Sequence, residues 1–291
     1  MRVLLTGGSG QVGTEVRRRA AGFQLLAPGR AEFDLARPAT LRPWLQRFRP
    51  ELVLSVGAYT AVDRAEDESA LAFSVNRDAI EVLAAYAQQA QAHLIHLSTD
   101  YVFDGKLERP YREDDLANPR GIYGASKLAG ELAARSAERH SVLRVGWVFA
   151  AHGSNFVRTM LRLGATRDHL RVVSDQWGGP TWAGHIAEAV LALTGRLMDG
   201  QPVPTGTWHY GGVPHLNWHG FAQEILIRAQ AAGLIDSLPQ IEAIATAEYP
   251  TRAPRPGNSR LDSGRACAEL GLTAPDWRVG LDAALRELAA G

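Results

Sequence analysis

A glycine-rich turn near the N-terminus constrains the fold more than any other feature of this sequence. The apolar run Arg2-Val3-Leu4-Leu5-Thr6 leads into Gly7-Gly8-Ser9-Gly10-Gln11-Val12-Gly13, and a helical pattern then continues to about Ala20. A strand, a tight turn and a helix bring backbone N–H groups and the positive end of the helix dipole to one point, where a pyrophosphate can bind. The alternative is a purely structural turn. The strand before it and the helix after it favour a dinucleotide site that includes Gly7, Gly10, Gln11, Val12 and Gly13.

Strand and helix patterns alternate through the first half of the chain. After the first strand, strands are expected over 24–27, 51–56, 93–97 and 141–145, with helical stretches over 39–49, 66–73, 75–91 and 123–139 between them. This order predicts an α/β fold with a Rossmann-type doubly wound parallel sheet and a smaller C-terminal substrate-binding lobe. We expect residues 1–150 to form the NAD(P)-binding domain, completed by parts of 170–212. Residues 151–291 are expected to form mainly the substrate-binding lobe, interleaved with the sheet.

Composition excludes several classes of protein. The 291 residues carry a formal net charge of +0, which gives no indication of a nucleic-acid partner or of an anionic membrane partner. No stretch of about 18 apolar residues is uninterrupted, so we expect no transmembrane helix. The single cysteine, Cys267, excludes an internal disulfide, and a cytoplasmic location is the default.

Residues after the second and third expected strands extend the dinucleotide site. Arg30 follows the second strand where NAD-preferring folds usually carry an acidic residue, so NADPH is favoured and NADH remains possible. A solvated loop charge is the alternative for Arg30. Asp34 can bond an adenine amino group or merely cap a turn. The cofactor-binding candidates from these two strand ends are Arg30, Asp34, Leu35, Ala58, Tyr59 and Thr60.

A tyrosine and a lysine four residues apart are candidates for catalysis. In Tyr123-Gly124-Ala125-Ser126-Lys127 the two side chains share one face if the segment is helical. An ammonium close to the phenol would lower the phenol pKa from about 10 and make Tyr123 a general acid. Lys106 and Lys127 are the only lysines, and all other basic side chains of the Lys/Arg type are arginines. A lysine at position 127 is therefore notable, because an ammonium differs chemically from a guanidinium. An incidental pair on an exposed helix is the alternative.

Hydroxyl groups follow the fourth expected strand. Ser98 and Thr99 can bond a substrate carbonyl and the Tyr123 phenol, or simply cap the strand end. His93 and His96 are expected on opposite sides of that strand. His215 and His219 have no third ligand near them in the sequence, so a solvated cap and a helix surface are the better interpretation. We therefore expect no metal site.

These features resemble the extended short-chain dehydrogenases/reductases. The resemblance covers essentially the whole chain and rests on the segments Gly10-Gln11-Val12-Gly13, Tyr59-Thr60-Ala61-Val62-Asp63, Ser98-Thr99-Asp100-Tyr101-Val102-Phe103, Leu128-Ala129-Gly130-Glu131, Asn155-Phe156, Asp175-Gln176, Gly179-Pro180-Thr181 and Arg255-Pro256-Gly257-Asn258-Ser259-Arg260-Leu261. It implies an NAD(P)H-dependent oxidoreductase of dTDP-rhamnose biosynthesis. The implied reaction is reduction of the 4-keto group of dTDP-4-dehydro-L-rhamnose to dTDP-L-rhamnose, with Tyr123 as the proton donor.

The resemblance also implies roles for individual residues. The catalytic residues would be Thr99, Tyr123 and Lys127, and Lys127 would also hold the nicotinamide ribose. The residues implied to contact the dTDP-sugar are Thr99, Asp100, Trp147, Asn155, Arg255, Asn258 and Arg260. Some members of the family dimerise through Mg²⁺ held by glutamates, but Gly184 stands where one of these is expected. We therefore expect no such metal bridge, and a monomer or weak homodimer.

Two alternatives remain at this stage. The first is a redox-neutral nucleotide-sugar epimerase or dehydratase on the same fold. Dehydratases place an acidic pair after the Ser-Thr, whereas here Asp100 is followed by Tyr101. The second is a noncatalytic regulatory subunit that resembles the β subunit associated with methionine adenosyltransferase. The presence of Thr99, Tyr123 and Lys127 together argues against that subunit.

Overall fold

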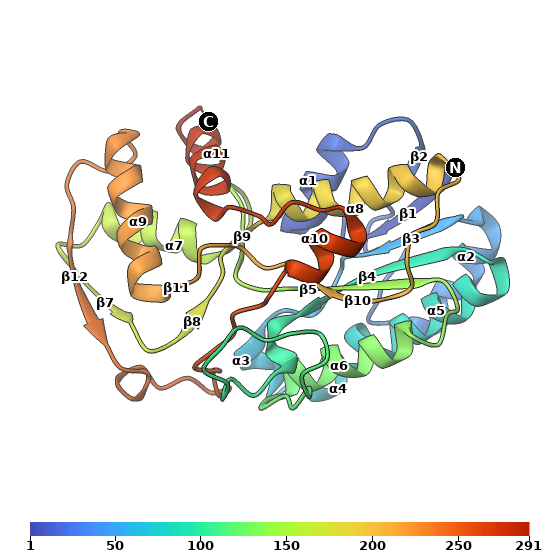
Figure 1. The fold of residues 1–291 in the computed structure, drawn as a ribbon, viewed down its shortest axis with the longest axis horizontal. Helices are drawn as coiled ribbons and strands as arrows, with labels where there is room; N and C mark the ends of the chain where they lie inside the picture. The colour runs from blue at the N-terminus through green and yellow to red at the C-terminus, as the bar shows by residue number, and fades with distance from the viewer. Residues whose placement is uncertain (291) are drawn as a thin grey trace.

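Six parallel strands form the main sheet of the computed structural model, which describes residues 1–290 (Figure 1). The strands are β1 (Arg2–Thr6), β2 (Gln24–Leu26), β3 (Leu52–Ser55), β4 (His93–Thr99), β5 (His140–Val145) and β10 (Gly206–His209). Their order across the sheet is β10-β5-β4-β3-β1-β2, so the direction of winding changes between β1 and β3. Ligands bind at such a switch point, beyond the carboxyl ends of the strands. The predicted Rossmann-type parallel sheet is confirmed.

Helices cover both faces of this sheet. One face carries α1 (Gln11–Arg19) and α8 (Ala183–Met198), and the other carries α2 (Leu41–Phe48), α5 (Ala79–Ala90) and α6 (Ile122–Ala134). Along β1, Val3 and Leu5 pack under the first pair of helices, whereas Leu4 packs under the second group. Because both faces of the sheet are buried, β1 and β3 each contain three consecutive apolar residues.

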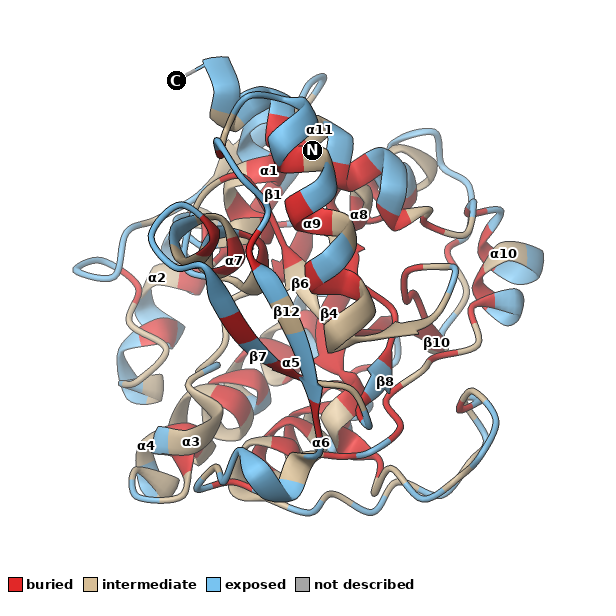
Figure 2. Cartoon of the chain, turned by 90° about the vertical axis from the view of Figure 1, so that its left-hand side faces the viewer, coloured by how far each residue is buried: buried red, intermediate tan, exposed pale blue. Residues whose placement is uncertain are grey.

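A second lobe lies beside the sheet, at the left of Figure 1. Its elements are β6 (Val148–Phe149), α7 (Phe156–Gly164), β7 (His169–Val173), β8 (Trp177–Gly178), β9 (Thr181–Trp182), β11 (Leu216–Asn217), α9 (Trp218–Ala231), β12 (Gln240–Ile244) and α11 (Trp277–Ala290). Its apolar core gathers Val157, Phe221 and Trp277 from α7, α9 and α11. Strands β7 and β12 pair in parallel; exposed and buried residues alternate along most of β7, whereas β12 is mostly exposed (Figure 2). Of the segment 170–212, therefore, α8 and β10 join the main sheet while β7 does not.

The remaining elements are short. They are α3 (Val62–Ala65), α4 (Ser69–Phe73), α10 (Gly264–Leu270), one π-helical turn (Ser74–Asp78) and the 3₁₀ turns Pro38–Thr40, Asp100–Val102 and Thr246–Glu248. The single helix expected over 66–73 is wrong, because α3 ends before Glu66 and α4 begins at Ser69. Helix α6 ends at Ala134, not near residue 139, because the turns Ser136 N to Ala133 O and Ala137 N to Ala134 O redirect the chain into β5. Within residues 1–290, no helix combines the length and the apolar character needed to cross a membrane.

Candidate active site

The glycine turn has a geometry that larger residues cannot adopt. Gly7 has a φ of +68°, and Gly10 N donates to Gly7 O at 2.9 Å just before α1 begins. A Cβ at Gly13 would lie 2.1 Å from Gly7 O, far closer than any real contact. The turn therefore packs against the first turn of α1 only because both positions lack side chains. This leaves the N-terminal N–H groups of α1 open to an anion.

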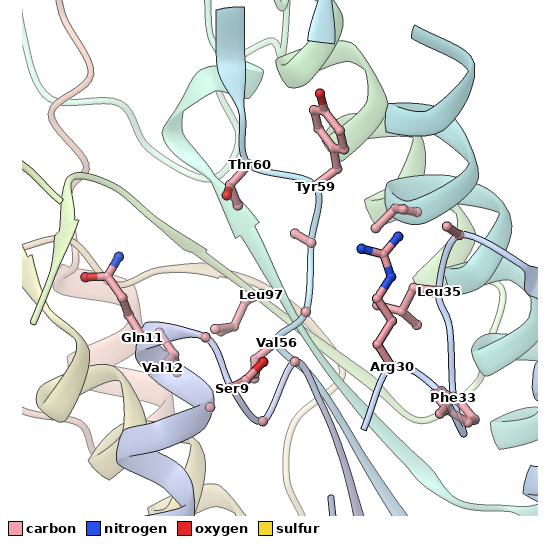
Figure 3. A pocket seen from close by; sticks show the side chains of 18 of the residues that line it. Ser9, Gln11, Val12, Arg30, Phe33, Leu35, Val56, Tyr59, Thr60 and Leu97 are labelled. Carbon is pink, nitrogen blue, oxygen red and sulfur yellow. The ribbon is translucent and has the colours of Figure 1, made fainter. Parts of the chain in front are cut away.

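A cavity of about 660 Å³ opens at this turn, at the switch point between β1 and β3. In Figure 3, Gln11 and Val12 lie at one end of it and Arg30, Phe33 and Leu35 at the other. Every residue predicted to bind the cofactor lines this cavity: Gly7, Gly10, Gln11, Val12, Gly13, Arg30, Asp34, Leu35, Ala58, Tyr59, Thr60, Tyr123 and Lys127. The size, the elongated lining and the glycine cradle fit a dinucleotide.

Charged groups gather at the Arg30 end of the cavity. The side chain of Arg30 is 78% exposed, and its Nε lies 3.2 Å from Asp34 Oδ1. The Asp34 carboxylate also accepts from Ala36 N at 3.0 Å, which is the turn-capping role considered for it. Sequence reasoning missed Arg17, which lines the same cavity from α1. Its spacing of four residues from Gly13 places it on the same helix face, and this was the available signal.

A buried amide ties the loop after β3 to α6. Asn76 Oδ1 accepts from Tyr59 N at 2.8 Å, and Asn76 Nδ2 donates to Tyr59 O at 3.1 Å and to Ser126 Oγ at 3.0 Å. Ser126 in turn donates to Tyr123 O at 2.8 Å. Asn76 is only 1% exposed, so this link has no competition from water. Its role depends on contacts distant in sequence, and no local motif predicts it.

Tyr123 is half-buried, lies beside Thr99 and lines the cavity. Burial raises the pKa of the Tyr123 phenol to about 12, and the Thr99 hydroxyl acts in the opposite direction. Thr99 Oγ1 donates to Asp100 Oδ1 at 2.9 Å and accepts from Tyr101 N at 3.2 Å. The structure thus brings Thr99 and Tyr123 together, as predicted. The phenol keeps its proton at neutral pH and is able to donate it.

The expected direct pairing of the Lys127 ammonium with the Tyr123 phenol is wrong in this structure. Lys127 Nζ donates to Leu97 O at 2.6 Å and lies 3.5 Å from His96 Nε2. A buried ammonium must satisfy its donors, and the backbone carbonyl is the strong acceptor within reach. Burial lowers the pKa of Lys127 to about 8, with Glu131 acting in the opposite direction. Lys127 still lines the cavity beside Tyr123.

Asp100 is almost completely buried next to these residues. Burial raises the pKa of its carboxyl to about 6, although the Thr99 hydroxyl lowers it in part. Among residues 1–290, its Oδ2 and the Oγ of Ser98 are buried atoms without a hydrogen-bond partner. A Cβ at Gly146 would lie 2.7 Å from that same Oδ2. The absence of a side chain at Gly146 keeps room beside the carboxylate.

The residues implied to contact the sugar fall into two groups, and they lie outside the dinucleotide cavity. Trp147 has a φ of +49°, stacks on Trp218 with ring centroids 3.4 Å apart, and donates from Nε1 to Ser259 Oγ at 2.9 Å. Asn155 caps α7 by accepting from Arg158 N at 3.1 Å, and its Nδ2 donates to Gln11 Oε1 at 2.9 Å. Asn155 therefore connects the second lobe to the glycine turn.

The second group comes from the loop before α10. Arg255 Nη2 donates to Asp63 Oδ2 at 2.6 Å, while its Nη1 is buried without a partner among residues 1–290. Asn258 donates to Leu107 O and accepts from Arg260 Nε at 2.8 Å. Arg260 lies over the ring of Trp177. Among residues 1–290, Arg255 thus has one buried donor without a partner, whereas Asn258 holds the loop in place.

The two histidines considered for metal binding, His215 and His219, each have a ring nitrogen close to a backbone carbonyl oxygen. His215 Nε2 lies 3.2 Å from Leu261 O, and His219 Nε2 lies 3.3 Å from Ile241 O. Both residues are half-buried, and His219 lies on α9, as the expected helix surface requires. Within residues 1–290, no three His, Cys, Asp or Glu side chains form a group able to hold a metal ion.

A doubly wound parallel sheet, a glycine cradle at its switch point, and Tyr123 and Lys127 in the cavity define a nicotinamide-dependent oxidoreductase of the Rossmann type. The family model described as the RmlD substrate binding domain matches residues 1–290, and the chain belongs to that family.

Curated relatives and solved structures agree with this assignment. The dTDP-4-dehydrorhamnose reductase of Burkholderia thailandensis is 41% identical and the alignment covers 99% of both chains. That of Escherichia coli K12 is 36% identical over 99% of this chain and 98% of its own. The dTDP-4-dehydrorhamnose reductase from Bacillus anthracis in complex with NADP superposes with a TM-score of 0.90 and 29% identity, covering 98% of this chain and 99% of that one. A UDP-glucose 4-epimerase from Thermus thermophilus shares the fold, with a TM-score of 0.75. It is 20% identical, and the superposition covers 100% of this chain and 99% of that one.

Proposed function

We propose that the chain reduces the 4-keto group of dTDP-4-dehydro-L-rhamnose to dTDP-L-rhamnose with NADPH, and that NADH can replace NADPH. The observation that carries this proposal is the position of Tyr123 and Lys127 in the lining of a cavity whose other residues suit a dinucleotide, with Thr99 beside the Tyr123 phenol. Full-length relatives named dTDP-4-dehydrorhamnose reductase support the choice of substrate. The relative in complex with NADP supports the choice of cofactor.

The residues around the cavity can perform the proton transfer. A bound nicotinamide supplies the hydride that reduces the ketone carbon. Tyr123 remains protonated at neutral pH, because its pKa is about 12, and it donates this proton to the developing alkoxide. The Thr99 hydroxyl orients the carbonyl oxygen. Lys127 Nζ donates to Leu97 O and lies 3.5 Å from His96 Nε2, and its remaining donor would hold the nicotinamide ribose. A positioned general acid of this kind is typically worth about 10²- to 10⁴-fold in rate.

The dTDP-sugar is proposed to lie between the sheet and the second lobe. Its contacts would be Asp100, Trp147, Asn155, Arg255, Asn258 and Arg260. Two atoms support this placement most directly: the free Nη1 of Arg255 can donate to a phosphate oxygen, and the free Oδ2 of Asp100 can accept from a sugar hydroxyl. Residues 1–150 with α8 and β10 would then hold the cofactor, and the remainder would hold the sugar nucleotide.

A redox-neutral epimerase or dehydratase is less consistent with the site. A dehydratase needs a second carboxylate beside Asp100, but the next residue is Tyr101, whose buried phenol has a pKa raised well above its usual range. Tyr101 is therefore no base at neutral pH. A noncatalytic role would leave the alignment of Thr99 and Tyr123 without a purpose.

A direct assay tests the proposal. The protein is incubated with dTDP-4-dehydro-L-rhamnose and either NADPH or NADH, and loss of reduced nicotinamide absorbance is followed together with the sugar product. We expect stoichiometric oxidation of the cofactor. Tyr123→Phe should lower kcat by about 10² or more while NADPH affinity changes less than about twofold. Cofactor that is recycled without net loss would favour the epimerase or dehydratase instead.

Location and assembly are also proposals. A dTDP-linked substrate and a single cysteine fit a cytoplasmic enzyme. We propose a monomer or a weak homodimer, because Gly184 offers no carboxylate for a Mg²⁺ bridge between two copies.

A further inference from the structure

A buried row of polar groups extends from Lys127 away from the cavity. Lys127 Nζ lies 3.5 Å from His96 Nε2, and the other ring nitrogen, His96 Nδ1, lies 3.1 Å from Ser55 Oγ. His96 and Ser55 are 0% exposed, and they are direct register partners on β4 and β3. The row therefore crosses from α6 through two neighbouring strands with no access to water.

The chemistry of these groups decides which atom donates. An ammonium can only donate, so His96 Nε2 must accept from Lys127 and must carry no proton. Burial and the nearby Lys127 charge both favour the neutral imidazole. The ring proton then sits on Nδ1 and is donated to Ser55 Oγ. A single tautomer of His96 satisfies both neighbours.

We propose that His96 is a positioning residue for Lys127, holding the ammonium through Nε2 while Ser55 holds the imidazole through Nδ1. Lys127 Nζ has three N–H donors, and Leu97 O and His96 Nε2 take two of them in fixed directions. The third donor is left for the cavity that Lys127 lines. The imidazole thus fixes which way the last donor of Lys127 points. This inference rests on the proposed function only where turnover is measured.

Loss of the His96 imidazole should change the pKa of Lys127 in a predictable direction. An acceptor for the ammonium favours the charged form of Lys127, whereas burial opposes it. The other ionisable groups that act here are Glu131 and Tyr123 on α6 itself, and Asp100 in the turn that follows β4, which faces Tyr123. None of these changes when His96 is replaced. Removal of the imidazole should therefore make the ammonium lose its proton at lower pH.

The first test needs no turnover. The protein is labelled with ¹⁵N-histidine, and the ring nitrogens of His96 are assigned from the signals that disappear in His96→Gln. At neutral pH we expect the neutral imidazole with its proton on Nδ1. A proton on Nε2, or an imidazolium, overturns the proposal. The result stands whether or not the chain reduces the proposed sugar, so failure of the function and failure of this inference are distinguishable.

The second test compares pH–rate profiles of matched variants. His96→Leu should shift the basic limb of the kcat profile to lower pH by about one unit and lower kcat at pH 8 by about fivefold, with KM for the sugar nearly unchanged. His93→Leu is the control, because His93 is also buried on β4 but bonds Ser141 Oγ at 2.9 Å, away from Lys127. It should lose comparable stability and keep the wild-type profile. Equal shifts in both variants, or none in His96→Leu, would overturn the proposal.

Amide replacements distinguish positioning from packing. In His96→Gln the amide reaches the place of Nε2 and can accept from Lys127, whereas in His96→Asn it reaches only toward Ser55. We expect Gln to retain the wild-type profile and Asn to behave like Leu. Comparison of His96→Gln with His96→Asn also tests the positioning role of His96 if His96→Leu does not fold. Identical profiles for Gln and Asn would contradict a role exerted through Nε2.

Discussion

At the scale of single residues, Gly13 shows how little space the cofactor turn allows. A methyl group at Gly13 would lie 2.1 Å from Gly7 O, so the turn must shift before any side chain fits. We expect Gly13→Ala to weaken NADPH binding by about tenfold or more and to destabilise the fold by about 1–3 kcal/mol. Fluorescence titration with NADPH and thermal unfolding measure the two effects.

Gly195 offers the matched control on α8, the helix that packs against α1. A Cβ there meets nothing within 4 Å, and the residue lies inside a helix. Gly195→Ala should therefore stabilise the protein by about 0.5–1 kcal/mol and leave NADPH affinity unchanged. Equal affinities for the Gly13 and Gly195 variants would contradict the account of the turn.

Asp100 predicts a dependence of stability on pH. Its folded-state pKa is raised to about 6 by burial, so the folded state binds the proton more tightly than the unfolded state does. Relative to a neutral side chain, stability is therefore lost as pH rises from about 4 through about 6 and stays low above that. Asp100→Asn should be more stable than the wild type by about 1–3 kcal/mol at pH 7, with no difference near pH 3. Chemical denaturation at both pH values checks this, and a constant difference would refute it.

Residue roles could be predicted where they depend on the local sequence, but not where they depend on contacts between residues far apart in the sequence. Residues such as Gly10 and Arg30 were predictable as cavity residues because each follows a strand end in the local sequence. The direction of Lys127 was not, because it depends on the carbonyl of Leu97, thirty residues away, and on burial. Asn76 likewise gains its role only through contacts that tertiary packing creates.

At the scale of elements, the start of α7 couples the second lobe to the cofactor turn. Asn155 both caps α7 and donates to Gln11 Oε1. Asn155→Ala should therefore cost about 1 kcal/mol of stability and also raise the Kd for NADPH several-fold. Thermal unfolding and cofactor titration separate the two losses.

Helix α9 provides the comparison for this prediction. Asn217 caps α9 by accepting from Gly220 N at 2.8 Å, and its Nδ2 donates to Ser174 O within the second lobe. Asn217→Ala should lose a similar amount of stability without any change in NADPH affinity. If both variants bind NADPH as the wild type does, the contact between Asn155 and Gln11 has no part in cofactor binding.

Periodicity predicts which elements exist better than it predicts where they end. Strand β3 is buried on both faces and is a run of mostly apolar residues, and β4 still has Leu94, Ile95 and Leu97 between its polar residues. The end of α6 at Ala134 depends instead on two tight turns within an alanine-rich segment that could have continued as a helix. The division of 62–73 into α3 and α4 was equally hidden, because its residues have no strong helix breaker between them.

At the scale of the whole molecule, assembly should not depend on a divalent cation. Gly184 offers no carboxylate, and a Cβ there would lie 2.4 Å from the ring of Trp182. We expect the same elution volume in size-exclusion chromatography with Mg²⁺ and with EDTA. A shift to a smaller species on adding EDTA would show a metal bridge built from other residues.

The main sheet receives its edge strand β10 and its covering helix α8 from far along the chain. A nascent chain that has left the ribosome only to residue 150 therefore has an open edge at β5 and lacks the cover that α8 gives to one apolar face of the sheet. The nucleotide-binding half stays unfinished until His209 has been synthesised, and the sheet of the second lobe waits for Ile244. Both halves mature late and almost together, so this protein is exposed to mispairing for most of its own synthesis.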